Sequence, residues 1–365
     1  MGISRMLKRS YRKIQCRRAG QSGLWLSEIG LGLWKWGDPS YDGSRVGDHD
    51  GFPILDRSLE HGIFHWDTAC SYNMGSGNSE RLLGRYFASR GREVRDQVVL
   101  ATKVSNPVRP EHVAEADFTP NQSGASRIYV QFAVEQCLRR LQTDVIDLLY
   151  IHSPRVDDTG EFIVPLDETW GAMDDLVTQG KVRYIAVSNH SARQMQSVAS
   201  TVTEVGKDSS RRIVAVQNRY NLLQRNRVAS EPEGSERAFL DVARSLGVSV
   251  IPYYPLASGL LTGRYRKDTL NKASGRIIDD GAQDAWFTDE NLNAVEALIG
   301  LAEQKGLSLA QLALGWLLSR EEVASVIAGV TRIEQLDDNV GAAELDPDDL
   351  GRIDAILEAA GLSNA

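Results

Sequence analysis

Four side chains of different chemistry stand at or just beyond the ends of three consecutive apolar runs of the chain. They are Asp67, Tyr72, Lys103 and His152. A lysine beside a tyrosine stabilises the phenolate, so we expect Lys103 to lower the pKa of Tyr72 from about 10 towards neutrality. Tyr72 would then give and take a proton near pH 7. Such a set is suited to protonating an alkoxide while a hydride arrives at its carbon atom.

The other members of the set would support that proton transfer. Asp67 would hold Lys103 through an ion pair, and His152 would orient a carbonyl group or share in the transfer. Taken singly, each residue also has an ordinary structural explanation. An aspartate at a strand end often caps a turn, and a tyrosine in a loop usually packs against neighbours. A lysine there is usually solvated, and a lone histidine is more often hydrogen-bonded within the core. The catalytic interpretation therefore depends on a fold that brings the four together.

Short apolar runs alternate along the chain with longer amphipathic stretches. The apolar runs span residues 29–34, 63–69, 98–104, 145–152, 183–189, 213–218, 248–255 and 323–330. The main helical stretches span residues 79–89, 126–141, 166–178, 235–246 and 307–319. Strands with few polar residues are typical of parallel sheets covered on both faces, so these units predict an α/β fold, a closed (β/α)8 TIM barrel. The carboxyl ends of barrel strands meet at one mouth, which would gather the four residues.

The two ends of the chain add to this barrel. Residues 14–29, with Ser22-Gly23 in the middle, predict an N-terminal β-hairpin, and residues 346–359 predict an extra C-terminal helix. We expect residues 1–17 to be a basic N-terminal extension and residues 18–365 to form a single domain, because no linker interrupts them. Three connections on the same face as the site are long, namely 105–125, 221–234 and 258–289, and the last two are candidate lids.

The charge of the chain is uneven. It holds 41 Lys and Arg against 49 Asp and Glu, a formal net charge of −8, yet residues 1–18 hold seven basic residues and no acidic one. The acidic body argues against nucleic acid as the main partner. The sequence leaves open three interpretations of the basic residues 1–18: a solvated extension, an organelle-targeting segment or a membrane-surface tail.

Cysteine usage and hydropathy narrow the class of protein further. Cys16, Cys70 and Cys137 are odd in number and widely spaced, which fits neither a disulfide framework nor a zinc site. We therefore expect a reducing, cytoplasmic compartment and no metal. No stretch approaches the roughly 18 apolar residues of a membrane span, so no stable membrane insertion is expected.

Several motifs, in order along the chain, resemble the aldo-keto reductase superfamily from about residue 18 to about residue 358. They read Asp67-Thr68-Ala69-x-x-Tyr72, Ala101-Thr102-Lys103, Tyr150-Ile151-His152-Ser153, Gly180-Lys181-Val182-Arg183, Gln217-Asn218-x-Tyr220-Asn221, Pro252-Tyr253-Tyr254-Pro255-Leu256-Ala257-x-Gly259-Leu260-Leu261-Thr262-Gly263 and Gly329-Val330-Thr331-Arg332. The resemblance implies a (β/α)8 barrel and NADP(H)-dependent carbonyl reduction. It makes Tyr72 the general acid, supported by Asp67, Lys103 and His152.

The resemblance also assigns residues to the cofactor. Ser188, Asn189 and Gln217 would hold the nicotinamide carboxamide, and Tyr253 would stack under the ring. The pyrophosphate would lie along Leu256, Ser258, Gly259, Leu260 and Gly263, with Arg264 supplying charge. Gly329, near the end of the last apolar run, also belongs to the implied cofactor site. Thr331 with Arg332 would face the 2′-phosphate, since arginine binds phosphate through two hydrogen bonds and helix N-termini attract anions. Gln335, Asp338 and Asn339 would approach the adenosine, although a solvated helix face accounts for their spacing as well.

The sequence also departs from the pattern of the family. The loop after Tyr72 is longer than in many relatives, and Met74 within it would touch substrate. His65 replaces an apolar residue, and we interpret it as a hydrogen-bonded core histidine rather than a catalytic one. Candidates for the wall of the substrate pocket are Trp34, Trp36, Met74, Phe118, Arg155 and Tyr220.

Two classes of function remain at this point. The first is an NADPH-dependent oxidoreductase that reduces an aldehyde or ketone to an alcohol, reversibly, with a small-molecule carbonyl or alcohol as its partner. The second is a nicotinamide-binding regulatory module of the same fold, similar to channel-associated β subunits. The complete set Asp67, Tyr72, Lys103 and His152 favours the enzyme. The substrate, the direction of the reaction and the oligomeric state, including a homo-oligomer, stay open.

Overall fold

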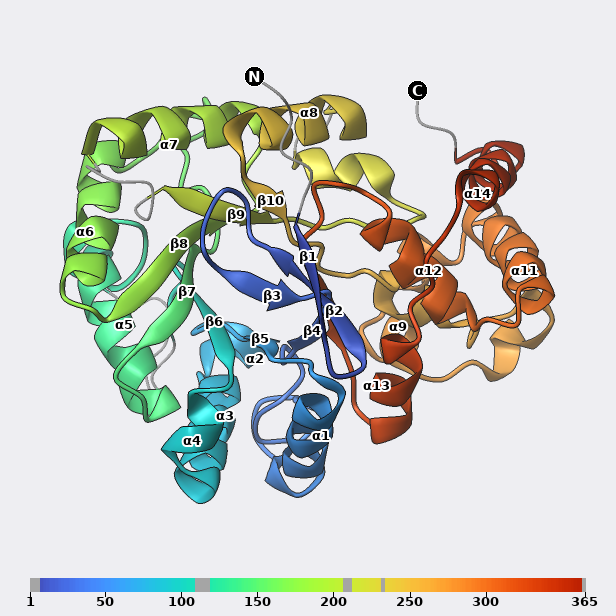
Figure 1. Cartoon of the computed structure of the whole chain (residues 1–365), viewed down its shortest axis with the longest axis horizontal. Helices are drawn as coiled ribbons and strands as arrows, with labels where there is room; N and C mark the ends of the chain where they lie inside the picture. The colour runs from blue at the N-terminus through green and yellow to red at the C-terminus, as the bar shows by residue number, and fades with distance from the viewer. Residues whose placement is uncertain (1–6, 109–118, 206–211, 231–233, 363–365) are drawn as a thin grey trace.

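Parallel strands form the centre of the protein, whose computed structural model describes residues 7–108, 119–205, 212–230 and 234–362. The strands hydrogen-bond in the order β10-β9-β8-β7-β6-β5-β4-β11 and curve around a common axis (Figure 1). They are β4 (Ile29–Gly32), β5 (His65–Asp67), β6 (Val99–Val104), β7 (Ile146–Ile151), β8 (Val182–Ser188), β9 (Ile213–Gln217), β10 (Ser249–Val250) and β11 (Val326–Gly329). Each lies within or overlaps one of the predicted apolar runs.

The two edges of this sheet meet, so the sheet is closed. Val250 of β10 bridges Val323 in parallel, just ahead of β11. The Val250 amide donates to the Glu322 carbonyl at 2.8 Å, and the Ala324 amide donates to the Val250 carbonyl at 3.1 Å. Closure leaves no unpaired edge and confirms the predicted (β/α)8 barrel.

Helices alternate with the strands and cover the outside of the barrel (Figure 1). Those that follow the strands are α1 (Asp48–His61), α3 (Asn78–Arg90), α5 (Arg127–Leu141), α6 (Leu166–Thr178), α7 (Ala192–Val205), α8 (Glu236–Leu246), α12 (Leu309–Leu318) and α13 (Ile333–Val340). Additional short or peripheral elements are α2 (Tyr72–Gly75), α4 (Arg92–Arg95), η2 (Pro120–Gln122), η4 (Arg225–Ala229), η5 (Ala257–Thr262), η6 (Lys267–Lys272), α9 (Arg276–Asp279), α10 (Gln283–Trp286), α11 (Asp289–Gln304) and α14 (Pro347–Ala359). The predicted C-terminal helix is α14.

A three-stranded antiparallel sheet closes one end of the barrel. It consists of β1 (Lys8–Tyr11), β2 (Ile14–Arg18) and β3 (Trp25–Ser27), and β2 with β3 is the predicted hairpin. Leu24 and Leu26 pack among apolar side chains that point into the barrel. The Gln21 amide donates to the carbonyl of Gly247, which precedes β10, so this sheet covers the amino ends of the strands. The opposite mouth stays available for a site.

The structure differs from the sequence prediction at the boundary of the basic extension. Charge patterning assigns residues 1–17 to the extension, but residues 8–17 form β1 and most of β2. The basic residues Lys8 and Arg9 lie on β1, whose four residues are all exposed, while the backbone pairs with β2. Backbone pairing along a sheet edge does not require apolar side chains, so the charge pattern of these residues did not predict a strand here.

A buried ion pair fixes the position of helix α3 beside the barrel. Arg140 of α5 donates from Nε to Glu80 of α3 at 2.7 Å, and both side chains are less than a tenth exposed. The hydroxyl of Thr102 donates to the other oxygen of Glu80 at 2.6 Å. Because Thr102 precedes Lys103 on β6, this network ties the helix after Tyr72 to the strand that carries the lysine.

Removing one partner of this pair is expected to destabilise the fold strongly. Glu80→Ala leaves the Arg140 guanidinium buried without its counter-charge, which costs about 3–5 kcal/mol of unfolding free energy. The control is Glu161→Ala. The partner of Glu161, Arg193, is exposed, so the loss of unfolding free energy in this variant should stay below about 1 kcal/mol. Urea unfolding followed by circular dichroism measures both. Equal losses of unfolding free energy in the two variants would contradict the stabilising role assigned to the pair of Glu80 and Arg140.

Candidate active site

The four candidate residues meet at the mouth formed by the carboxyl ends of β5, β6 and β7. Asp67 is the last residue of β5, Lys103 is next to last on β6, and His152 directly follows β7. Tyr72 begins the short helix α2 beyond β5. Parallel strands place these ends side by side, so residues that are far apart in the sequence assemble into one group.

Lys103 is the centre of the hydrogen-bond network. Its Nζ donates to Asp67 Oδ2 at 2.6 Å, to the Tyr72 hydroxyl at 2.8 Å and to the Thr68 carbonyl at 2.8 Å. The ammonium group therefore has a partner for each of its three donors. The side chains of Lys103 and Asp67 are each 1% exposed, so the pair is held away from water.

The Tyr72 hydroxyl lies between the two charged groups. It accepts from Lys103 and donates to Asp67 Oδ2 at 3.1 Å. The second carboxylate oxygen, Asp67 Oδ1, accepts from Gln217 Nε2 at 2.8 Å. Both oxygens of Asp67 are thus engaged, and the orientation of the carboxylate is fixed from two strands.

The structure corrects the expected pKa of Tyr72. Burial and the adjacent Asp67 carboxylate raise the pKa of Tyr72 well above its ordinary value, and burial lowers the pKa of Lys103. The sequence predicts a lysine beside the tyrosine, but Asp67 pairs with that lysine at short range and offsets its positive charge. Tyr72 is therefore a protonated phenol in this state, which suits a proton donor.

His152 lies beside Tyr72 as a neutral imidazole. Burial, with the positive Lys103 nearby, lowers the pKa of His152 to about 3. The two rings meet edge to face, with centroids 6.1 Å apart, and His152 Nδ1 lies 3.3 Å from the Ser71 hydroxyl. A neutral imidazole carries one N–H donor, so His152 can hold an oxygen atom in place but is not a source of protons at neutral pH.

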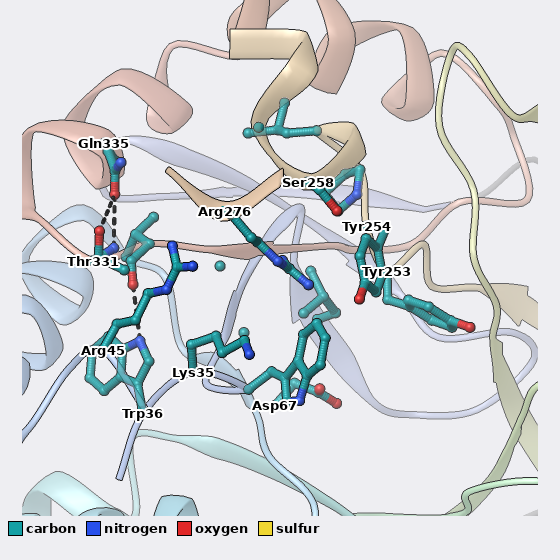
Figure 2. A pocket seen from close by; sticks show the side chains of 18 of the residues that line it. Lys35, Trp36, Arg45, Asp67, Tyr253, Tyr254, Ser258, Arg276, Thr331 and Gln335 are labelled. Atoms are coloured by element: carbon teal, nitrogen blue, oxygen red, sulfur yellow. Dashed lines mark hydrogen bonds between the residues drawn. The ribbon is translucent and has the colours of Figure 1, made fainter. Parts of the chain in front are cut away.

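A cavity of about 700 Å³ lies above these residues (Figure 2). Most of the cofactor residues expected from the sequence line it, while Lys103 lies beneath it. The predicted residues that line it are Asp67, Tyr72, His152, Ser188, Asn189, Gln217, Tyr253, Leu256, Ser258, Gly259, Arg264, Gly329, Thr331, Arg332, Gln335, Asp338 and Asn339, together with Trp34 and Trp36. A volume of this size is within the range of cofactor sites in proteins.

One end of the cavity has the chemistry of a phosphate site. Arg264 and Arg332 are exposed, and within the described residues neither side chain has an ion pair. Helix α13 begins directly after Arg332, so its N-terminal amides face the same region. The backbone at Ser258 and Gly259 has positive φ angles of 57° and 98°, a turn that exposes amides to an anion. This donor set fits the phosphates of a nicotinamide dinucleotide.

The other end of the cavity has preset polar groups beside Tyr72. Asn189 Nδ2 donates to the His152 carbonyl at 2.8 Å, and its Oδ1 accepts from the Tyr253 hydroxyl at 2.6 Å. The Ser188 hydroxyl donates to the Gln217 carbonyl at 2.7 Å. Asn189 has a φ of 58°, a strained conformation of the kind that concentrates at functional sites. These bonds connect the ends of β7, β8 and β9.

Comparisons with known proteins show the family of the chain. Residues 28–358 match the model of the aldo/keto reductase family. The chain belongs to the aldo-keto reductase family. It is 32% identical over 337 residues to L-glyceraldehyde 3-phosphate reductase of Escherichia coli strain K12, covering 91% of this chain and 88% of that protein. It is 32% identical to aldo-keto reductase AMT2 of Alternaria alternata, with 91% and 88% covered.

The chain is also similar, over most of its length, to a protein whose name indicates a different role. The chain is 28% identical over 341 residues to a probable voltage-gated potassium channel subunit beta of Arabidopsis thaliana, with 92% of each chain covered. Aldo-keto reductases as a family are oxidoreductases that generally use NAD(P)H. Among the described residues of this family member, no group of His, Cys, Asp or Glu is placed to hold a metal ion.

Some predicted site residues of this aldo-keto reductase lie elsewhere. Tyr220 is fully buried and donates to Glu236 in the core, so it is absent from the cavity wall. Leu260 points into the core, while Gly263, which ends η5, and Arg155, which follows β7, also do not line the cavity. Phe118 lies outside the described residues, as does the side chain of Met74.

Sequence reasoning did not single out Arg276 as a residue of the cavity wall. Arg276, the first residue of helix α9, lines the cavity beside Tyr254 (Figure 2). Its guanidinium lies 4.3 Å from the Trp34 ring centroid and 4.5 Å from that of Tyr254. Arg45 pairs with Asp279 at 2.8 Å, which ties α9 to the loop after β4. A signal is present in the sequence, because α9 belongs to the long connection 258–289 that is a candidate lid, but the partners of Arg276 come from distant segments.

Buried neutral histidines are expected to make the fold acid-sensitive. Burial lowers the pKa of His152 to about 3 and those of His65 and His190 to about 4. The unfolded chain, with histidine pKa values near 6.5, binds more protons, so stability falls as the pH drops from about 7 towards 4. Each histidine should cost about 2 kcal/mol at pH 5.

Urea unfolding between pH 8 and pH 5 measures this loss. His190→Asn, which keeps a donor for the Ser188 carbonyl, should remove one histidine's share of the pH dependence. His49→Asn is the matched control, because the His49 side chain is 99% exposed and should leave the slope unchanged. An identical slope for His190→Asn and wild type would show that this histidine is not held neutral.

Proposed function

We propose that this aldo-keto reductase is an NADPH-dependent oxidoreductase that reduces an aldehyde or ketone to an alcohol, reversibly. The observation that carries the proposal is the Tyr72 hydroxyl, held 2.8 Å from Lys103 Nζ at the floor of a cavity about 700 Å³ in volume. The proposal includes a single catalytic domain over residues 18–365, a small carbonyl or alcohol as substrate, and a cytoplasmic location. None of the described helices is long and apolar enough to cross a membrane.

The residues of the chain divide the reaction into distinct tasks. When bound, the reduced nicotinamide supplies the hydride. Tyr72 donates its hydroxyl proton to the substrate oxygen as negative charge develops there, and Lys103 then stabilises the phenolate through the hydrogen bond already present. Asp67 keeps Lys103 charged and aimed at the tyrosine, and His152 donates a hydrogen bond to the same substrate oxygen.

The cofactor would lie along the length of the cavity. Ser188, Asn189 and Gln217 would hold its carboxamide, and the ring of Tyr253 would stack against the nicotinamide. Arg264 would meet the pyrophosphate, while Thr331 and Arg332 would meet the 2′-phosphate at the start of α13. Gln335 supports that end, since its Oε1 accepts from the Thr331 amide at 2.8 Å (Figure 2).

A binding module is the second candidate, favoured by the likeness to a potassium channel subunit beta. Such a module would bind nicotinamide without depending on turnover. Catalysis is favoured instead by the hydrogen-bond network, which orients the Tyr72 hydroxyl, occupies the three donors of Lys103 and fixes the Asp67 carboxylate. A panel of aldehydes, sugars, ketosteroids and quinones, followed by NADPH absorbance, separates the two candidates.

Removing only the Tyr72 hydroxyl is expected to abolish most of the proton transfer. Tyr72→Phe should reduce single-turnover hydride transfer about 10²–10⁴-fold, the usual contribution of a positioned acid. Lys103→Met should have a similar effect, because the phenolate loses its stabilising charge. NADPH affinity, measured by fluorescence titration, is the control and should be nearly unchanged for Tyr72→Phe. Retained affinity with unchanged transfer would mean that Tyr72 is not the acid.

Arg332 is expected to select NADPH over NADH. Arg332→Ala removes a charge-assisted contact worth about 1.5–3 kcal/mol, so it should weaken NADPH about 10–150-fold and NADH little. The matched control is Arg264→Ala. Because Arg264 would meet the pyrophosphate, which both cofactors share, this variant should weaken the binding of both alike. Calorimetric titration of each variant with each cofactor measures this. Similar losses of NADPH and NADH for Arg332→Ala would show that Arg332 does not read the 2′-phosphate.

A further inference from the structure

A second tyrosine, which the proposed mechanism does not use, lies beside Lys103 inside the barrel. Tyr150 is next to last on β7, and the parallel register pairs it directly with Lys103 on β6. Residues paired in register on neighbouring strands point to the same face of the sheet, so both side chains enter the barrel. Tyr150 is fully buried there, in the cluster of apolar side chains that also contains Leu148 and Ala186.

The aromatic ring of Tyr150 is within interaction distance of the Lys103 ammonium. Lys103 Nζ lies 5.7 Å from the ring centroid of Tyr150 and 4.8 Å from that of Tyr72. The three N–H donors of Lys103 are already engaged by Asp67, Tyr72 and the Thr68 carbonyl, so Tyr150 does not act through a hydrogen bond to it. A cation within about 6 Å of a ring centroid is attracted by the electrons of the ring, more strongly where water is excluded.

The hydroxyl of Tyr150 is separate from this contact. It is buried and faces the side chains of Gln217 and Asp67, yet it has no hydrogen-bond partner among the described residues. A buried hydroxyl without a partner costs free energy, so packing alone would be served at least as well by phenylalanine. The ring and the hydroxyl of Tyr150 can therefore be tested separately.

The positive charge of Lys103 is the property that the ring would protect. Burial lowers the pKa of Lys103, whereas the proposed mechanism needs the ammonium charged at the moment when Tyr72 becomes a phenolate. Tyr72 changes its own charge during that step, but Tyr150 does not. The attraction between the Tyr150 ring and the ammonium would thus persist through the whole reaction.

Several other titratable groups face Lys103 from the elements packed against it. Besides the Tyr72 phenol, they are Asp67 and His65 of β5, Cys70 after β5, Glu80 of α3 and His152 after β7. At neutral pH both histidines are uncharged, because burial lowers the pKa of His65 to about 4 and that of His152 to about 3. A substitution at Tyr150 leaves all these groups in the chain, so a change in the pKa of Lys103 would report on the ring.

We infer that Tyr150 is a positioning residue, whose ring keeps the Lys103 ammonium charged and in place beside Tyr72. This inference rests on the proposed function, in which Lys103 stabilises the Tyr72 phenolate. It adds a residue that acts through Lys103 rather than on the substrate or the cofactor. Because the ring attracts a cation and not a neutral amine, removal of the ring should lower the pKa of Lys103.

The pKa of Lys103 tests the inference directly. Protein labelled with ¹³C and ¹⁵N in lysine gives this pKa by NMR titration, with Lys103→Met to assign the signal. Tyr150→Leu should lower the pKa by about one pH unit, as expected for the loss of one buried contact between a cation and a ring. Tyr150→Phe keeps the ring and should leave the pKa as in wild type.

The sign of the change distinguishes the ring contact from a loosened core. Water that enters a loosened core favours the charged amine and would raise the pKa of Lys103. An unchanged or raised pKa in Tyr150→Leu therefore overturns the inference. A thermal melt reports on folding, and Tyr150→Met, for which the same decrease is expected, replaces the leucine variant if that variant melts early.

A matched control removes another ring from the same interior. Tyr184 of β8 is paired in register with Leu148 and packs against the same apolar cluster, two residues before Ala186 and farther from the site. Tyr184→Leu should leave the pKa of Lys103 unchanged. An equal decrease in Tyr184→Leu and Tyr150→Leu would show a general effect of core substitution and would overturn the inference.

Single-turnover hydride transfer separates this inference from the proposed function. In wild type supplied with NADPH and an aldehyde that it reduces, the rate should fall as the pH rises and Lys103 loses its charge. Tyr150→Leu should show this fall about one pH unit lower, with KM little changed. A wild-type pH profile in Tyr150→Leu overturns the inference. If wild type reduces no carbonyl compound and Tyr150→Leu still lowers the pKa of Lys103, the ring contact is supported and only the reductase proposal fails.

Discussion

The buried ion pair between Lys103 and Asp67 is the interaction on which the rest of the site depends. Two side chains that are each 1% exposed cannot stay charged unless they face each other at short range. The pair fixes the lysine ammonium, the ammonium fixes the Tyr72 hydroxyl, and Gln217 fixes the remaining carboxylate oxygen. The position of one phenolic oxygen is thus determined from β5, β6 and β9 at once.

That arrangement explains how a raised pKa of Tyr72 is compatible with the proton transfer proposed for it. In the absence of a substrate, Asp67 and burial hold the proton on the phenol, so the group does not lose it to solvent. A carbonyl oxygen that gains negative charge is a better acceptor, and Lys103 already lies at the oxygen that will become the phenolate. In the proposed mechanism, the balance between Asp67 and Lys103 would release the proton of Tyr72 only as negative charge develops on the substrate oxygen.

Much of the barrel and of the site could be predicted from the sequence, because periodicity and strand order are local. Each strand overlaps its apolar run, and Asp67, Lys103 and His152 had to meet once their strands were parallel neighbours. The raised pKa of Tyr72 could not be predicted, because it results from burial of the hydroxyl and from the adjacent Asp67 carboxylate, and the sequence shows neither. Tyr220 failed as a wall residue for a similar reason, because its partner Glu236 comes from another helix.

Helix α9, whose Arg276 lines the cavity, is held by weaker interactions than the floor of the site. The floor residues lie on strand ends that pair along the whole sheet, whereas α9 is held by contacts that water can compete for, such as the half-exposed pair of Arg45 and Asp279. Arg276 is placed against Trp34 and Tyr254 by ring contacts, which carry little directional constraint.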